Sequence, residues 1–202
     1  MTLTYDEKVA PTLWSVESRP QAEVLRDLVR ICWPGHESLL DPTWGSGKFY
    51  PFGDFQPTFA SDGHADRARD AQHDFTKLPH PDRAFDVVVF DPPFQPATVD
   101  GIIGERFTKP VRGIADLERL VRAGAAECWR VARRGLVIKV QDYIHDHKPV
   151  WMSRWLWSEL GEPYEVVHVT RKAKLKATNW SRQLSAYRNH STFWAFSREK
   201  NR

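Results

Sequence analysis

The sequence has little cysteine and no long apolar run, and each absence argues against a class of protein. Cys32 and Cys128 are its only cysteines, so we expect two buried free thiols and no disulfide-stapled secreted fold. No stretch reaches the roughly 18 apolar residues that a membrane-spanning helix needs. The opening residues, MTLTYDEKVAP, lack the apolar core of a signal peptide. The sequence therefore predicts a soluble cytoplasmic protein without a membrane partner; it does not indicate the oligomeric state.

Metal-binding and nucleophile motifs are also missing. His145 and His147 stand two residues apart, but no third ligand accompanies them, so we expect a solvated loop and no metal site. The absence of a Gly-x-Ser-x-Gly elbow argues against a hydrolase. With 202 residues, 41% hydrophobic, 27% charged and a net charge of +3, the chain has the composition of one globular domain. It shows no internal repeat, and residues 1–17 are expected to be an irregular lead-in.

Short apolar runs alternate with helical patterns along the chain. We expect strands at 38–41, 58–62, 84–90, 135–140, 164–170 and 191–197, with a weaker one within 73–79. Helical spacing predicts helices at 19–33, 66–72, 115–132 and 149–160. This alternation is typical of an α/β fold with a mostly parallel sheet covered on both faces. The last two strands, joined by a basic loop, predict an antiparallel pair at one edge.

Acidic residues follow several of these strands. Asp41, Asp62 and Asp91 stand at predicted carboxyl ends, and Asp74 lies near the weaker strand. Ligands of such sheets bind outside the carboxyl ends of the strands, near the point where strand order reverses. The four carboxylates are therefore candidate site residues.

A glycine-rich turn, DPTWGSGKF, follows the first of these strands. Gly45 and Gly47 permit a sharp turn and close approach of the backbone to a ligand. The turn lacks both the third glycine of the dinucleotide fingerprint and the GxxxxGK[ST] phosphate cradle, which favours a nucleoside without a pyrophosphate. S-adenosylmethionine is such a ligand, and its positive charges suit a nearby carboxylate such as Asp41. Asp62, about 20 residues on, is placed to receive ribose hydroxyls.

The segment DVVVFDPPF ends a core strand in an acid and a rigid corner. An exocyclic amino group of a base is a poor nucleophile because its lone pair is delocalised into the ring. The Asp91 carboxylate and the Pro92 carbonyl, whose position Pro93 restricts, are suited to accept hydrogen bonds from the two N–H groups of this amine. Phe94 offers a surface on which the base can stack. Catalysis by these four residues would rest on positioning and fixed electrostatics. The alternative is a tight strand exit with Phe94 in the core.

DPTWGSG and DPPF, about 45 residues apart, together resemble the class I S-adenosylmethionine-dependent amino-methyltransferases, including the adenine-N6 and cytosine-N4 DNA methyltransferases. The resemblance runs from about Ser18 to Phe94 and continues more loosely beyond. It implies a Rossmann-like seven-stranded sheet with an antiparallel last strand, with Asp62 on the ribose and Asp74 on the adenine amino group. Arg19 stands where this family has a lysine. The implied cofactor-binding residues are Arg19, Pro20, Asp41, Pro42, Thr43, Gly45, Gly47, Asp62, Asp74 and Asp91.

Basic residues gather in two later segments. Residues 171–190 form a predicted hairpin loop that contains no acidic residue. Trp180 and Tyr187 stand among its six lysines and arginines, a pattern suited to binding nucleic acid. Residues 95–114 form a predicted substrate loop. The candidate nucleic-acid contacts are Arg106, Lys109, Arg112, Arg171, Lys172, Lys174, Lys176, Trp180, Arg182 and Arg188. The alternative for the later segment is a solvated hairpin.

These patterns predict a single-domain DNA methyltransferase, with adenine N6 favoured over cytosine N4. The 45 residues between the two motifs leave no room for a separate target-recognition domain. A duplex target would require base flipping. The alternatives are the same chemistry on RNA, more distantly on protein or small-molecule amides, or a catalytically idle module that binds nucleic acid.

Overall fold

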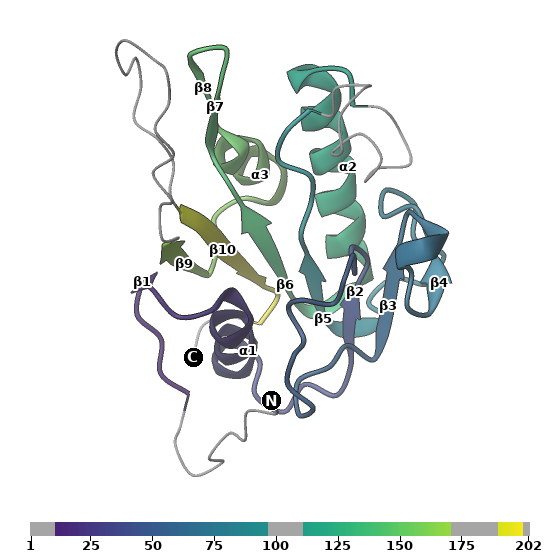
Figure 1. The fold of residues 1–202 in the computed structure, drawn as a ribbon. Coiled ribbons are helices and arrows are strands. Elements are labelled where there is room, and N and C mark those ends of the chain that lie inside the picture. Colours follow the sequence, from purple (N-terminus) through teal and green to yellow (C-terminus); the bar gives the residue numbers. More distant parts are fainter. Residues whose placement is uncertain (1–10, 97–110, 171–189, 200–202) are drawn as a thin grey trace.

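The computed structural model describes residues 11–96, 111–170 and 190–199 (Figure 1). Eight of its strands form one sheet in the order β1-β9-β10-β6-β5-β2-β3-β4. Their bounds are Val16–Glu17 for β1, Leu39–Asp41 for β2, Phe59–Asp62 for β3, Ala71–Gln72 for β4, Phe85–Phe90 for β5, Ala132–Val140 for β6, Glu165–Thr170 for β9 and His190–Ser197 for β10. Two further strands, β7 (Tyr143–His145) and β8 (Lys148–Val150), form a separate hairpin.

The sheet is mostly parallel, as predicted, and β10 is its antiparallel strand. The pairs β2–β3, β2–β5, β3–β4 and β5–β6 are parallel, whereas β10 runs antiparallel to both β6 and β9. The expected antiparallel pair formed by the last two strands, β9 and β10, is confirmed. Within the sheet, β10 lies between β6 and β9, and the two-residue strand β1 extends this edge by pairing parallel with β9 through Val16 and His168. The lead-in predicted for 1–17 therefore ends in a short strand.

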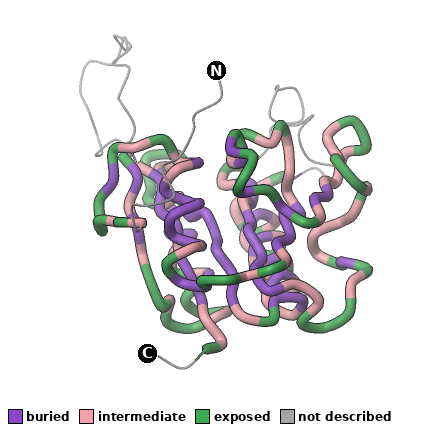
Figure 2. Tube along the Cα trace, turned by 90° about the horizontal axis from the view of Figure 1, so that it is seen from below, coloured by how far each residue is buried: buried purple, intermediate pink, exposed green. Residues whose placement is uncertain are grey.

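Helices cover both faces of the sheet. Alternate residues of β5 and β6 enter two separate cores, since successive strand side chains point to opposite faces. Val87, Val89 and Val137 pack with α1 (Gln21–Cys32), while Val88 and Leu136 pack with α2 (Ile114–Val131) and α3 (Met152–Leu160). Figure 2 shows the buried residues concentrated in the strands and on the helices that cover them.

Two predicted elements take another form. The helix expected at 66–72 is one 3-10 turn, Ala65–Arg67, followed by β4, and no strand lies within 73–79. Asp74 explains the second difference, since its Oδ1 accepts hydrogen bonds from the Thr76 amide and hydroxyl at 2.9 and 2.7 Å and so turns the chain. The helix expected from 149 begins at Met152, because Lys148–Val150 pair with β7.

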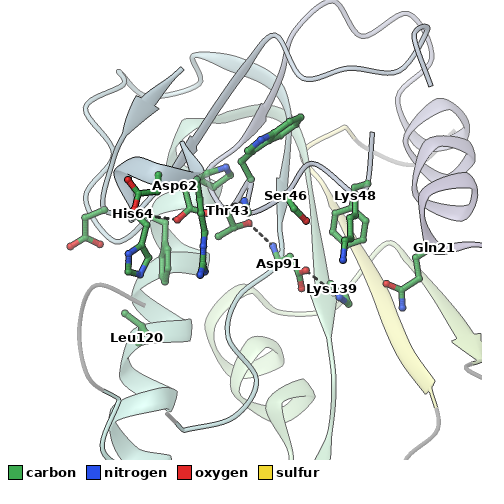
Figure 3. A pocket seen from close by; sticks show the side chains of 18 residues that line it. Gln21, Thr43, Ser46, Lys48, Asp62, His64, Asp91, Leu120 and Lys139 are labelled. Carbon is green, nitrogen blue, oxygen red and sulfur yellow. Dashed lines mark hydrogen bonds and ion pairs between the residues drawn. The ribbon is translucent and has the colours of Figure 1, made fainter. Parts of the chain in front are cut away.

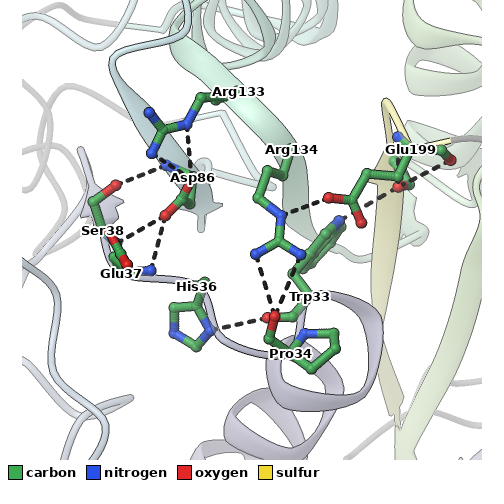
Figure 4. A network of polar contacts seen from close by, with 10 residues as sticks. Trp33, Pro34, His36, Glu37, Ser38, Asp86, Arg133, Arg134 and Glu199 are labelled. Carbon is green, nitrogen blue, oxygen red and sulfur yellow. Dashed lines mark hydrogen bonds and ion pairs between the residues drawn. The ribbon is translucent and has the colours of Figure 1, made fainter.

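A polar network ties the sheet together at the amino ends of β2 and β5 (Figure 4). Asp86 Oδ2 accepts the backbone N–H groups of Glu37 and Ser38 at 2.8 and 3.2 Å, and Asp86 Oδ1 accepts Arg133 Nε at 2.8 Å. Nearby, the Trp33 indole lies against Gly135 of β6, where an added Cβ would come within 1.9 Å of the ring. These contacts fix how α1 and β2 enter the sheet.

Three smaller expectations concern described residues. Cys32 and Cys128 are buried free thiols, as predicted. His145 and His147 are exposed on the β7–β8 hairpin, and the described ranges contain no group of three metal-ligating side chains. In the same ranges, no helix is both long and apolar enough to cross a membrane.

Candidate active site

The glycine turn starts where β2 ends. Gly45 and Gly47 have φ angles of +59° and +65°, which residues other than glycine rarely adopt. Gly47 also lies under the Trp44 indole, so an added Cβ would come within 2.4 Å of that ring. Trp44 in turn stacks on Tyr50 at 5.3 Å between ring centres. Both glycines are therefore required for the shape of the turn.

Asp41 lies beneath this turn and holds it from inside. Its Oδ1 accepts the Thr43 amide at 2.8 Å and the Thr43 hydroxyl at 3.1 Å. Burial raises the pKa of Asp41 to about 7, against the hydrogen bonds from Thr43, which lower it. The Tyr50 hydroxyl also lowers this pKa, although it makes no hydrogen bond of ordinary geometry. Asp41 is 1% exposed, and Thr43 is the residue of this pair that lines the cavity.

Thr43 joins the glycine turn to the Asp-Pro-Pro-Phe corner. The Asp91 backbone N–H donates to Thr43 Oγ1 at 2.9 Å (Figure 3), and the same hydroxyl donates to Asp41. The two predicted motifs, 48 residues apart along the chain, are thus connected through one side chain. The parallel pairing of β2 with β5 brings them there, because both strands end at the same edge of the sheet.

An open cavity of about 790 Å³ lies above these motifs. This volume falls within the usual range for small-molecule sites. Figure 3 shows Asp62, His64 and Leu120 toward one end, Lys48, Gln21 and Lys139 toward the other, and Thr43, Ser46 and Asp91 between them. The cavity thus opens at the carboxyl ends of the central strands, where the sequence predicted a site.

Asp62 and Asp74 line the cavity, as do Pro42, Gly45 and Asp91. The Asp62 carboxylate accepts the Gly45 amide through Oδ2 and the His64 amide through Oδ1, both at 2.9 Å. Each carboxylate oxygen has a further lone pair, so these bonds leave capacity for a ligand. Asp62 therefore connects the turn after β2 with the turn after β3.

Arg19 and Pro20 do not line the cavity. Arg19 donates to Glu17 Oε1 at 2.7 Å and to Asp27 Oδ2 at 2.8 Å, which fastens β1 to α1. Pro20 caps the start of α1. Gln21, the first helical residue, lines the cavity instead, and its side chain donates to Ser191 Oγ at 2.7 Å.

Within the Asp-Pro-Pro-Phe corner, Pro92 and Pro93 are buried and Phe94 is partly buried against the core on the α2 side. Phe94 thus has both a core contact and an exposed part. The strand-exit interpretation and the base-stacking interpretation are compatible with this position.

The sequence analysis missed Lys139, a cavity-lining residue of β6. Its ammonium lies 3.1 Å from Asp91 Oδ2, and 5.2 and 5.5 Å from the ring centres of Phe49 and Phe94. Phe90 pairs with Ile138, so the residues that follow them, Asp91 and Lys139, come side by side. A single lysine inside the apolar run GLVIKV was the available signal.

Most predicted nucleic-acid contacts lie outside the described residues. These are Arg106, Lys109, Arg171, Lys172, Lys174, Lys176, Trp180, Arg182 and Arg188. Arg112 is described and is exposed just before α2. The basic surface therefore stays a prediction.

Comparison with known proteins gives a fold and no close relative. No protein-family profile and no curated protein matches the sequence. Among solved structures, one from Thermoplasma acidophilum aligns with a TM-score of 0.50 at 11% identity over 87% of each chain. A SAM-dependent methyltransferase from Archaeoglobus fulgidus aligns at 0.48, with 14% identity over 86% of this chain and 93% of the other.

TrmN from Thermus thermophilus aligns at 0.49, with 14% identity over 87% of this chain and 48% of its own. The chain has the Rossmann-like class I methyltransferase fold. In this sheet, strand order reverses at the β2–β5 pair, and the cavity lies at that point.

Proposed function

We propose that this protein is an S-adenosylmethionine-dependent methyltransferase that acts on the exocyclic amino group of a DNA base, with adenine N6 favoured over cytosine N4. One observation supports the proposal: the Asp91 amide donates to Thr43 and Thr43 donates to Asp41, and Asp91, the first residue of the Asp-Pro-Pro-Phe corner, lines the same cavity as Gly45 of the glycine turn. A cofactor site and an amine site must adjoin in this way for direct methyl transfer.

The residues present fit the cofactor. Asp62, toward one end, supplies an acceptor for the ribose hydroxyls, and Asp74, which also lines the cavity, supplies one for the adenine amino group. The Gly45–Gly47 turn allows close approach of the backbone. Gln21 and Lys48, toward the other end, are donors suited to the amino-acid carboxylate. When bound, the cofactor supplies an electrophilic methyl group.

The Asp91 corner would hold the target amine. In the proposal, the Asp91 carboxylate and the Pro92 carbonyl accept hydrogen bonds from the two N–H groups of the amine, and Phe94 stacks on the base. Transfer of the cofactor's methyl group to the amine nitrogen would break the carbon–sulfur bond of the cofactor and release one proton, which would pass to solvent in the open cavity, directly or through the Asp91 carboxylate. Fixed acceptors favour this step because they stabilise the positive charge that develops on the nitrogen.

The preference for DNA rests on the sequence resemblance and on the acid-free basic segment 171–190. The test is incubation of methyl-labelled S-adenosylmethionine with duplex DNA, single-stranded DNA and total RNA in parallel, followed by nucleoside analysis. Label in N6-methyladenine or N4-methylcytosine from DNA supports the proposal and names the base. Label confined to RNA would overturn the DNA assignment, and absence of label from all three would overturn the function.

A further inference from the structure

Lys139 is a nearly buried ammonium in an apolar strand. Its side chain is 9% exposed, and its neighbours Ile138 and Val140 belong to the hydrophobic core. Burying a charge is costly unless it is paired and hydrogen-bonded. A role at the cavity would account for a lysine at this position.

The ammonium has more donors than its protein contacts use. A lysine ammonium carries three N–H donors, and Asp91 Oδ2 is the one acceptor found for it among the described residues. The rings of Phe49 and Phe94 face the same ammonium without offering a conventional acceptor. Because Lys139 lines the cavity, its other N–H groups are available to a ligand that brings an acceptor close to Asp91.

Asp91 and Lys139 therefore present an acceptor and a donor side by side, 3.1 Å apart. Adenine and cytosine carry the complementary pair: the carbon that bears the exocyclic amino group is bonded to a ring nitrogen with a free lone pair. On the Watson–Crick edge of guanine, the ring nitrogen beside the exocyclic amine, N1, instead carries a hydrogen, which would oppose the ammonium.

We propose that Lys139 is a specificity-determining residue that donates a hydrogen bond to the ring nitrogen beside the target amine, N1 of adenine or N3 of cytosine. The proposal rests on the proposed function, in which Asp91 accepts from the amine itself. Both atoms belong to the Watson–Crick edge, so this contact requires an unpaired or flipped base.

The experiment uses oligonucleotides in which the methylated adenine is replaced by 1-deazaadenine, which lacks the N1 acceptor, or by 7-deazaadenine as the matched control. Loss of a hydrogen bond from a charged donor lowers kcat/KM by about 10- to 100-fold. We expect this loss for 1-deazaadenine with the wild-type enzyme and little loss for 7-deazaadenine. A carbon in place of N1 withdraws less electron density from the amine, so lower nucleophilicity does not explain such a loss.

The variant Lys139→Met completes the cycle, with exposed Lys148→Met as the control for loss of a lysine charge. In Lys139→Met, adenine and 1-deazaadenine should react within about twofold of each other, because the hydrogen bond from Lys139 to N1, which only adenine can accept, is gone. Lys139→Gln keeps a neutral N–H donor and should show an intermediate penalty. An equal 1-deazaadenine penalty in the wild type and in Lys139→Met, or none in the wild type, would overturn the proposal.

Lys139 could instead contact the cofactor, and calorimetric titration with S-adenosylmethionine in the absence of nucleic acid tests this role. The affinity for S-adenosylmethionine should be the same for the wild type and for Lys139→Met. A loss of affinity of tenfold or more would assign the ammonium to the cofactor. Methylation of adenine without any 1-deazaadenine penalty defeats this inference alone. No methylation of any base by the wild type defeats the proposed function as well.

Discussion

At the scale of single residues, Asp91 is the side chain on which the proposed chemistry depends most directly. It follows the central strand β5, lines the cavity and pairs with Lys139. Asp91→Ala should lower methyl transfer by about 100-fold or more, because an acceptor aimed at developing charge is lost. Radiometric assays should show this loss, while calorimetry shows cofactor affinity within a fewfold of wild type. Glu162→Ala, at an exposed carboxylate beyond α3, is the control; loss of folding in Asp91→Ala would indicate a structural role instead.

Thr43 has a structural prediction of its own. Thr43→Val removes the hydroxyl that accepts from the Asp91 amide and donates to Asp41. Leaving these groups without their partner should lower the free energy of unfolding by about 1–3 kcal/mol. Urea denaturation measures this difference. Thr170→Val, which removes a 3.3 Å hydrogen bond at the exposed end of β9, should cost less than about 0.5 kcal/mol. Equal effects of the two changes would contradict the linking role of Thr43.

Residue by residue, the sequence was informative where chemistry shows locally. Asp91, Gly45 and Gly47 stand out because a strand, a turn and a carboxylate are adjacent in the chain. Lys139 does not, because its meaning depends on the register between β5 and β6. Arg19 was expected to contact the cofactor, but it forms ion pairs with Glu17 and Asp27. The sequence gives no local sign of this pairing, because Asp27 meets Arg19 only once α1 has folded.

At the scale of elements, the close packing of α1 on β6 depends on Gly135. The Trp33 indole occupies the space of a Cβ at that position. Gly135→Ala should therefore lower the free energy of unfolding by about 3 kcal/mol through overpacking. Gly53→Ala is the matched control, since nothing lies within 4 Å of the added methyl group there. Thermal and urea unfolding of both variants measure the difference, and comparable stability would mean that Trp33 moves aside at little cost.

The basic segment 171–190 carries an element-scale prediction about binding. Replacing Lys172, Lys174 and Lys176 together by glutamine should weaken nucleic-acid affinity. Each phosphate contact contributes about 0.9 to the slope of log affinity against log salt, so the slope should fall by up to about 3. Fluorescence anisotropy across a salt series measures it. An unchanged slope would remove these lysines from the interface.

At the element scale, the sequence predicted whether a segment is a helix or a strand better than it predicted which strands lie next to one another. Periodicity located β2, β3, β5, β9 and β10, and the long helix α2, to within one residue at each end, and it located β6 except for its first three residues. It failed at Ala65–Gln72, where a helical pattern is too short to resist pairing of β4 with β3. The insertion of β10 between β6 and β9 is a tertiary choice that no local pattern reports.

At the scale of the whole molecule, the buried carboxyl of Asp41, next to the cavity, makes the free energy of unfolding depend on pH. Burial raises the pKa of Asp41 to about 7, above the ordinary value of 3.8 expected in the unfolded chain. The folded protein therefore holds a proton there that the unfolded chain loses as pH rises from about 4 to about 7. Stability contributed by Asp41 is fully present below about pH 4 and declines through that window, by an order of 4 kcal/mol.

Asp41→Asn isolates this contribution, because asparagine keeps an oxygen that can accept from Thr43 but does not titrate. The difference in unfolding free energy between wild type and Asp41→Asn should shift against the wild type as pH rises from 4 to 7.5. Other titrating groups largely cancel in that difference, since both proteins share them. Urea denaturation at several pH values measures it. A pH-independent difference would mean that Asp41 is ionised throughout. A decline would show that the turn is held by a carboxyl that ionises near neutral pH, where a cationic ligand in the adjoining cavity would favour its charged form.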